Sequence, residues 1–124
     1  MPFDWLNYLE LAKELNEEVE SRWERLSEAV KRTIVSRAYY SAFCYIRNYE
    51  HKHRNFKIKH KPEDHQNLIE HLKKIGRNEI ANKLSNLRTI RNNCDYDDVV
   101  ENIDETVEGA LVNAEELLQA YREL

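Results

Sequence analysis

The densest group of reactive side chains in this sequence lies within six residues, 91–96. Arg91 and Asn92 open the segment, and Asp95 and Tyr96 close it. A guanidinium binds phosphate through two parallel hydrogen bonds and stabilises negative charge that develops in a reaction. The neighbouring amide, carboxylate and phenol would orient a ligand and shape its site. The segment therefore predicts a helix that delivers polar side chains to a functional site, and the alternative is a helix end that frays into a polar turn.

Two helices must position this segment. Leu84, Leu87 and Ile90 recur at helical spacing directly before it, so a helix carries the segment to its place. A second helix is predicted over residues 36–43, where Tyr39 and Tyr40 point about 100° apart. One of these phenols can therefore be buried while the other borders a groove.

The composition predicts long amphipathic helices, because the chain has only two glycines and two prolines and 34% of its residues are charged. Apolar periodicity predicts five helices. Ser21 and Glu24 have the spacing of a capping box before the second helix, and the basic segment 54–62 predicts a loop. We expect one domain, residues 1–124, folded as an all-α bundle whose helices span residues 5–18, 28–53, 62–75, 78–94 and 99–122.

Length and residue usage exclude several other classes of protein. No apolar run approaches the roughly 18 residues of a membrane span, and no signal-like segment opens the chain. Two cysteines, Cys44 and Cys94, are too few for a disulfide framework and are expected to be reduced. These features predict a cytoplasmic protein.

Charge is segregated along the chain. Residues 1–20 carry a net charge of −5, residues 95–124 carry −9, and the residues between them carry +10. The basic middle would attract anions. The alternative is that the oppositely charged helices pair with one another across their exposed faces.

Metal and nucleophile motifs are not evident. His51 and His53 are two residues apart, which places them on different sides of a helix, and His65 and His71 are six apart. There is no glycine-rich phosphate loop and no serine nucleophile motif, and Cys44 has no evident base beside it. We expect no metal and no cofactor.

Two motifs together resemble the HEPN superfamily (higher eukaryotes and prokaryotes nucleotide-binding). One is Arg37-x-Tyr39-Tyr40-x-x-Phe43, and the other is Arg91-Asn92-x-x-Asp95-Tyr96 at the end of a later helix. The first helix, with Tyr8-Leu9-x-Leu11-Ala12-x-x-Leu15, and His65 at the start of the third also look like one branch of this family. The resemblance extends over nearly the whole chain.

The resemblance implies a four- to five-helix up-and-down bundle, often a homodimer with both sites near a shared cleft. Many members are metal-independent endoribonucleases of toxin–antitoxin, CRISPR-associated or anti-phage systems, and others bind RNA or nucleotides without cleaving them. Some pair with a nucleotidyltransferase-type antitoxin that modifies a tyrosine near the catalytic histidine. By this resemblance, Tyr96 would be the tyrosine that is modified. The alternative is that Tyr96 is a buried residue that anchors the segment to the core.

Catalytic members carry an arginine, then a polar residue, and a histidine that is separated from the arginine by four to six intervening residues. Arg91 and Asn92 match the first two, but the histidine positions hold Tyr96, Asp97 and Asp98. A phenol with a pKa near 10 or a carboxyl near 4 is poorly matched to proton transfer at pH 7, and losing acid–base help costs roughly 10²–10⁴-fold in rate. The site is therefore better equipped to hold a phosphate than to cut beside it. The alternative for Arg91 is an ion pair with Asp95 or Asp97.

Three hypotheses follow. The first is a HEPN domain that binds RNA or a nucleotide, with weak or no ribonuclease activity, in a toxin–antitoxin or defence setting. In the second, the bundle is a protein-interaction module of a larger complex. The third is an active nuclease that takes a histidine from elsewhere, with His51, His53 or His65 as candidates. Beyond residues 91–96, the first hypothesis expects ligand contacts or a basic approach surface from Arg37, Tyr39, Tyr40, Lys57, Lys59 and Lys61.

Overall fold

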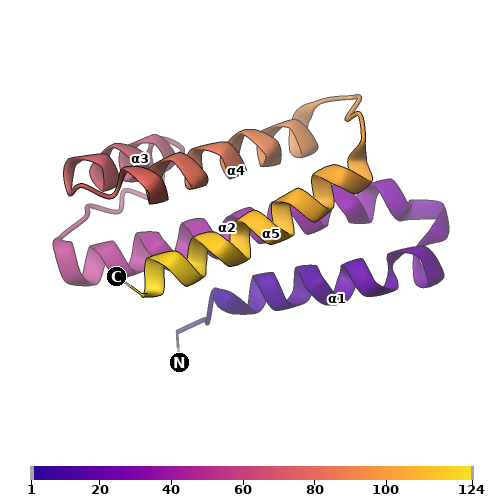
Figure 1. Ribbon diagram of the computed structural model, residues 1–124, viewed down its shortest axis with the longest axis horizontal. Coiled ribbons are helices and arrows are strands. Elements are labelled where there is room, and N and C mark those ends of the chain that lie inside the picture. Colours follow the sequence, from indigo (N-terminus) through magenta and orange to yellow (C-terminus); the bar gives the residue numbers. More distant parts are fainter. Residues whose placement is uncertain (1, 124) are drawn as a thin grey trace.

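A computed structural model describes residues 2–123 of the chain, which form five α-helices and one 3₁₀ turn with no strand among them. The helices are α1 (Leu6–Arg22), α2 (Ser27–Arg54), α3 (Glu63–Lys74), α4 (Asn78–Tyr96) and α5 (Ile103–Arg122), and the turn η1 is Glu24–Leu26. The long helices alternate in direction, and α3 is a short addition at one end (Figure 1). The all-α up-and-down bundle is confirmed.

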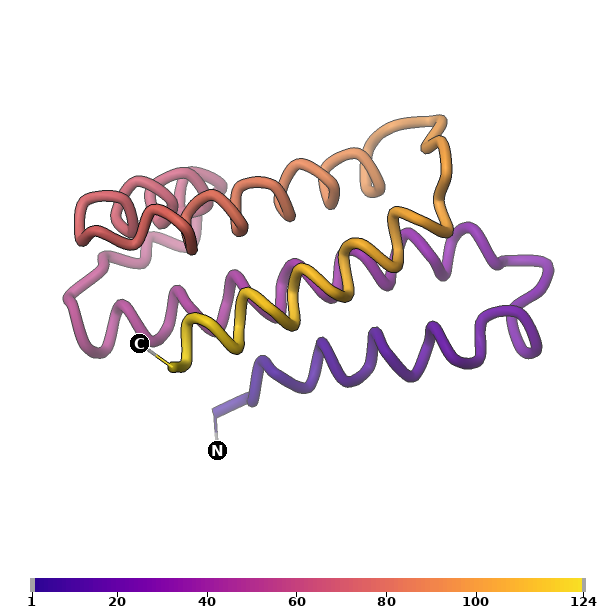
Figure 2. The backbone as a smooth tube through the Cα atoms, viewed as in Figure 1, coloured from indigo at the N-terminus to yellow at the C-terminus, as the bar shows by residue number. Residues whose placement is uncertain are grey.

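Helix α2 is the centre of the bundle. It packs against α1, α4 and α5, and the tube view shows the chain leaving its C-terminus, turning back through a loop and entering α3, which lies against α4 (Figure 2). An apolar stripe on α2 is buried at Ile34, Ala38, Ala42 and Ile46, each fully shielded from solvent. Spacing of four residues places these side chains on one face, where small alanines let neighbouring helices approach.

Helix boundaries near the third helix are as predicted. Pro62 precedes α3, where its missing N–H costs no hydrogen bond, and Glu63 and Asp64 occupy the first turn. Gly76 ends the helix with φ +83°, a conformation that favours glycine because a Cβ would be strained there.

Three other boundaries differ from the prediction by two residues or more. Helix α1 continues to Arg22 because Val19 is still buried, so Ser21 lies inside the helix and donates to the Glu18 carbonyl instead of capping the turn that precedes α2. The predicted capping box is therefore wrong. Helix α4 reaches Tyr96, two residues further than predicted. Helix α5 begins only at Ile103, because Asn102 before it is left-handed with φ +54°.

The C-terminal end of α4 is held by Arg32 of α2. Its guanidinium donates to the carbonyls of Cys94 at 2.9 Å, Asp97 at 2.6 Å and Asp98 at 3.1 Å. The last carbonyls of a helix have no partner within the helix, and a cation there also opposes the negative end of the helix dipole. This contact fixes where the segment 91–96 lies relative to α2.

Some of the oppositely charged residues form ion pairs between helices. Lys31 of α2 binds Glu20 and Asp104 at 2.7 Å each, which raises the pKa of Lys31, and Lys13 binds Glu115 at 3.0 Å. The acidic first and last helices are thus partly neutralised by bases of other helices. Arg47, Arg88 and Arg91 take no part in these ion pairs between helices.

Candidate functional site

A pocket of about 530 Å³ opens between the middle of α2, the start of α3 and the second half of α4. Its walls are formed by aromatic and basic side chains from all three helices and from the loop before α3. Arg91 and Asn92 come from α4, Tyr40 and Phe43 come from α2, and His65 comes from α3. The structure therefore brings the two sequence motifs, 37–43 and 91–96, to one cavity.

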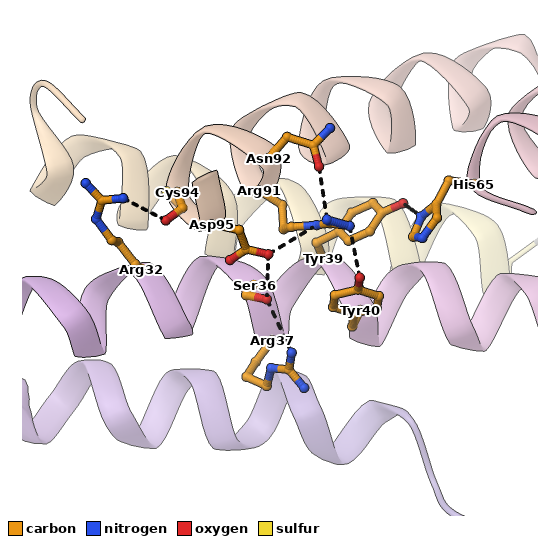
Figure 3. Close-up of polar contacts among 10 residues, drawn as sticks. All are labelled: Arg32, Ser36, Arg37, Tyr39, Tyr40, His65, Arg91, Asn92, Cys94 and Asp95. Carbon is orange, nitrogen blue, oxygen red and sulfur yellow. Dashed lines mark hydrogen bonds and ion pairs between the residues drawn. The ribbon is translucent and has the colours of Figure 1, made fainter. Parts of the chain in front are cut away.

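Arg91 lies at the inner wall of this pocket and is only 4% exposed. Its Nη2 donates to the Tyr40 hydroxyl at 2.9 Å and its Nη1 donates to Asn92 Oδ1 at 3.0 Å (Figure 3). Its Nε has no hydrogen-bond partner among residues 2–123 and lies 3.6 Å from Asp95 Oδ2. Two of the five guanidinium N–H groups are therefore engaged by good hydrogen bonds, and the pairing with Asp95 is loose.

Two phenol rings hold the Arg91 guanidinium. Its Cζ atom is 5.0 Å from the ring centroid of Tyr39 and 4.9 Å from that of Tyr40, and the two rings meet edge to face. A cation is attracted to the faces of aromatic rings, so the pair stabilises a charge that burial would otherwise disfavour. Tyr39 itself is fully buried, which raises the pKa of its phenol. It therefore supports Arg91 from behind and does not line the pocket.

His65 forms the wall beside these residues. Its ring stacks on Phe43 with centroids 4.1 Å apart, and its Nδ1 lies 2.5 Å from the Tyr39 hydroxyl. Burial, together with the nearby charges of Arg91 and Arg88, lowers the pKa of His65 to about 4. The imidazole is therefore neutral near pH 7.

Two further arginines line the same pocket. Arg88 of α4 donates to Gln66 at 3.3 Å, and Arg47 of α2 donates to Asn48 at 2.9 Å. Within residues 2–123 neither of them forms an ion pair with a carboxylate. The only carboxylate on the pocket wall is Asp64, whose oxygens accept the backbone N–H groups of the loop residues 59 and 60. The pocket therefore carries a clear excess of positive charge.

The remaining residues of the segment 91–96 have different positions. Asn92 lines the pocket and holds Arg91, whereas Asp95 turns toward Ser36, with 3.5 Å between their oxygens, and does not line it. Tyr96 stands at the rim with 75% of its surface exposed, so it is not a buried anchor. The expected ion pair of Arg91 is present with Asp95 alone, at 3.6 Å, and no pair with Asp97 occurs in the described chain.

Of the basic residues expected to approach the ligand, Lys61 alone lines the pocket. Arg37 lies over the rings of Tyr8 and Tyr40, at 4.6 Å and 5.3 Å, and bridges α1 and α2. Lys57 and Lys59 lie outside the pocket, and Lys59 Nζ is 3.8 Å from Glu63. Arg37 is therefore a packing residue in this structure.

Of the three histidines considered for catalysis, only His65 reaches the pocket. His51 donates from Nδ1 to the Phe56 carbonyl at 2.7 Å, and His53 packs on Tyr49 with centroids 4.1 Å apart. Both contacts lie at the C-terminal end of α2, outside the pocket. A nuclease that uses His51 or His53 at this site would require a different arrangement of the chain.

Sequence reasoning missed Arg47 and Arg88. Arg88 precedes Arg91 by three residues, which puts both on one face of a helix, and Arg47 follows Tyr40 by two helical turns. These spacings were available in the sequence. They become informative only after Arg91 and Tyr40 are known to face the same cavity.

A comparison with protein families agrees with this arrangement, since the family model described as HEPN domain matches residues 7–124. The chain belongs to the HEPN family. No curated protein and no solved structure shows a significant match. The predicted family is thus confirmed over nearly the whole chain. The departure noted above remains, because positions 96–98, where four to six residues would separate a histidine from Arg91, hold no histidine in this HEPN domain.

Two searches of the described chain gave negative results. Residues 2–123 contain no group of three or more His, Cys, Asp or Glu side chains arranged to hold a metal ion. Every helix among these residues is too short or too polar to cross a lipid bilayer.

Proposed function

We propose that this HEPN domain binds RNA or a nucleotide through its phosphate groups and leaves the ligand intact. The observation that carries the proposal is the clustering of three guanidinium groups, those of Arg47, Arg88 and Arg91, on the wall of one pocket. Their only carboxylate partner in the described chain is Asp95, at a loose 3.6 Å from Arg91. Three nearly unneutralised charges repel one another, and a bound polyanion removes that repulsion.

The donors on the wall suit phosphate oxygens. Arg91 keeps one N–H on each of Nη1 and Nη2 beyond the two that it donates to Asn92 and Tyr40. The Tyr40 hydroxyl accepts from Arg91, so its own proton remains for another acceptor in the pocket that it lines. A phosphate beside Arg91 would accept these charge-assisted hydrogen bonds.

The protonation state of His65 on the pocket wall favours binding without cleavage. Cleavage through a ribose 2′-hydroxyl needs a base and an acid whose pKa values lie near the working pH. His65 has a pKa of about 4, so it is a weak base at pH 7. The positions at which catalytic members carry their histidine hold Tyr96, Asp97 and Asp98, and none of these side chains is an imidazole. The second motif residue, Asn92, positions Arg91 and transfers no proton.

A second candidate function is supported by a different surface. A groove of about 510 Å³ runs between α1 and α5, with Leu6, Leu9 and Leu118 on its wall and carboxylates such as Glu10 and Glu115 beside them. Apolar side chains rimmed by charge are typical of protein-docking surfaces. The protein-interaction hypothesis would use this groove and leave the arginine pocket without a role.

Fluorescence anisotropy with a labelled single-stranded uridine decamer at low salt tests the proposal. Arg88→Ala removes a half-buried pocket charge, and Arg25→Ala removes an exposed arginine outside the pocket. We expect Arg88→Ala to weaken binding about tenfold and Arg25→Ala to leave it near that of the wild type. Gel analysis of the same RNA after incubation without metal should show only full-length strands. No binding by the wild type, or equal losses in both variants, would refute the proposal.

The setting and the partners are proposed on the family resemblance. They are action in a cytoplasmic toxin–antitoxin or defence system, a homodimer, and a nucleotidyltransferase-type antitoxin. Light scattering coupled to size exclusion would test the dimer, and co-purification with the product of a neighbouring gene would test the antitoxin.

A further inference from the structure

The hydroxyl group of Tyr39 has one possible partner. Its ring is fully buried between α2 and α4, and its oxygen lies 2.5 Å from Nδ1 of His65. Among residues 2–123 no other group forms a hydrogen bond with this oxygen. Burial raises the pKa of the phenol, so the oxygen keeps its proton near neutral pH.

A buried hydroxyl proton needs an acceptor, because leaving it unpaired costs the full desolvation of the group. Neutral imidazole has one nitrogen that donates and one that accepts. If Nδ1 of His65 carried the proton, that N–H would point at Tyr39 and the phenol proton would have no acceptor. If Nδ1 is bare, it accepts the phenol proton and both groups are satisfied. The ring proton then resides on Nε2.

The Nε2 edge of His65 faces the accessible side of the ring. Nδ1 is turned toward a fully buried phenol, and one ring face is stacked on Phe43 with 16° between the planes. Nε2 forms no hydrogen bond within the described chain. Three side-chain polar atoms there are both buried and unpaired, and Nε2 is not one of them, so it is accessible to solvent. His65 lines the same pocket as Arg88 and Arg91.

We infer that His65 is a neutral hydrogen-bond donor, in which Tyr39 holds Nδ1 as the acceptor and Nε2–H binds a phosphate oxygen of the ligand in the arginine pocket. This inference rests on the proposed function for its ligand, and on the Tyr39 contact alone for its tautomer. Tyr39 is a positioning residue, since it acts through His65 and touches no ligand.

The tautomer also supports the proposal that the site binds RNA without cleaving it. The nitrogen that faces the pocket holds a proton and has no free lone pair, so it cannot take a proton from a ribose hydroxyl. The nitrogen with the lone pair is occupied by Tyr39. His65 therefore contributes binding in a position where a catalytic histidine would contribute acid–base chemistry.

The charges around His65 keep the ring in this state near neutral pH. Burial is the main cause of its lowered pKa, and Arg91 and Arg88 from α4 and Arg47 from α2 add to it, while Asp64 on α3 acts in the opposite direction. With the pKa at about 4, the imidazole carries a single ring proton at pH 7. A bound phosphate would offset the arginine charges without altering which nitrogen Tyr39 occupies.

The tautomer can be read directly by long-range ¹H–¹⁵N correlation spectra of the wild-type protein labelled at its histidines, with His65→Gln used to assign the signals. We expect the pattern of a bare Nδ1 and a protonated Nε2 for His65 at pH 7. A protonated Nδ1, or an imidazolium with both nitrogens protonated, would overturn the inference and leave the proposed function standing. Tyr39→Phe removes the phenol and should allow a mixture of tautomers in a ring that remains stacked on Phe43.

The ligand contact is tested with the same uridine decamer. His65→Gln keeps an N–H donor, so it should bind within about threefold of the wild type, whereas His65→Leu should lose about tenfold. Adding the decamer to the wild type should also shift the Nε2 resonance. If the tautomer is as expected but neither the resonance nor the affinity responds, the contact with the ligand is refuted. If the decamer does not bind at all, the proposed function fails with it.

Discussion

The hydroxyl of Tyr40 on α2 accepts a hydrogen bond from Nη2 of Arg91 on α4 at 2.9 Å, across 51 positions of sequence. Because Tyr40 is half-buried and borders the pocket, this bond connects the core-facing arginine to the open side of the site. It also joins the two motifs by which the family was predicted. Neither motif forms a site without the other.

Tyr40→Phe tests that bond. The variant keeps the ring under the guanidinium and removes only the oxygen, so the cation–π contact at 4.9 Å survives. We expect the free energy of unfolding to fall by about 1–2 kcal/mol, because Arg91 loses a partner in a buried position. Affinity for the uridine decamer should fall as well, since the pocket loses a donor. Urea denaturation and anisotropy measure the two effects, and an unchanged affinity would argue against Tyr40 as a ligand contact.

Arg32→Ala tests whether Arg32 holds the C-terminal end of α4. The variant removes three hydrogen bonds to the carbonyls at the end of the helix, of which two are shorter than 3.0 Å. We expect a loss of about 1–3 kcal/mol in stability, with fraying of residues 91–96 visible in amide hydrogen exchange. Arg25→Ala is the matched control, because Arg25 is exposed and lies on the turn before α2. Equal stability of the two variants would show that the end of α4 is held by other contacts.

A buried carboxylate predicts how stability depends on acid. Glu50 is fully buried and is bound by Tyr121, by His71 at 2.7 Å and by Arg54 at 2.7 Å. Burial alone would raise its pKa, but the hydrogen bonds from Tyr121 and His71 and the charge of Arg54 lower it below the usual value. The carboxylate therefore adds stability above the unfolded pKa of about 4.3, and that stability is lost as pH falls through the lower folded pKa.

Glu50→Gln should remove this acid-dependent component, and thermal melts between pH 3 and 7 would show it as a flatter curve below pH about 4.5. At pH 7 we expect the variant to be less stable by roughly 3–5 kcal/mol, because Arg54 loses its buried counter-charge and the hydrogen bonds from Tyr121 and His71 lose a charged acceptor. Glu63→Gln, at an exposed position of α3, should leave both the stability and its pH dependence close to those of the wild type. If the melting temperature of Glu50→Gln fell below pH about 4.5 as steeply as that of the wild type, the role given to the buried carboxylate would be contradicted.

His65 predicts a second pH effect in a different range. Its pKa in the folded protein is about 4, against about 6.5 in the unfolded chain, so the unfolded state takes up the proton first. Stability should therefore fall as pH drops from about 6.5 to about 4, and His65→Gln should remove this part of the decline. Chemical denaturation at closely spaced pH values measures it. A variant with the wild-type slope in this range would show that His65 titrates as in the unfolded chain.

Much of the fold follows from local patterns. The four-residue spacing of Ile34, Ala38 and Ala42 predicts α2 because burial of one face is what stabilises such a helix. The predictions failed where two local signals compete. At the end of α1, burial of Val19, one residue past the predicted helix end, continues the helix to Arg22 and keeps Ser21 from acting as a cap.

The candidate site was only partly predictable. Arg91, Asn92 and Tyr40 came from motifs, but the sequence does not show that Tyr39 faces the core and Tyr40 the pocket, since that depends on how α4 crosses α2. The loop lysines were expected in the site because of their charge. Asp64 accepts hydrogen bonds from the backbone of residues 59 and 60, and Phe56 is buried in the core. The path of the loop is set by these contacts, and of its three lysines only Lys61 lies at the pocket.

The salt dependence of RNA binding tests the central claim, that the arginine pocket is where phosphate binds. We compare the wild type with the double variant Arg47→Gln/Arg88→Gln, and with Arg22→Gln/Arg25→Gln, which removes the same charge outside the pocket. Affinity for the uridine decamer is measured across a potassium chloride series. The pocket variant should lose roughly 1.4 units of the slope of log K against log salt, about 0.7 for each phosphate contact, and the control should keep the wild-type slope. Equal slopes in the wild type and the pocket variant would contradict the claim.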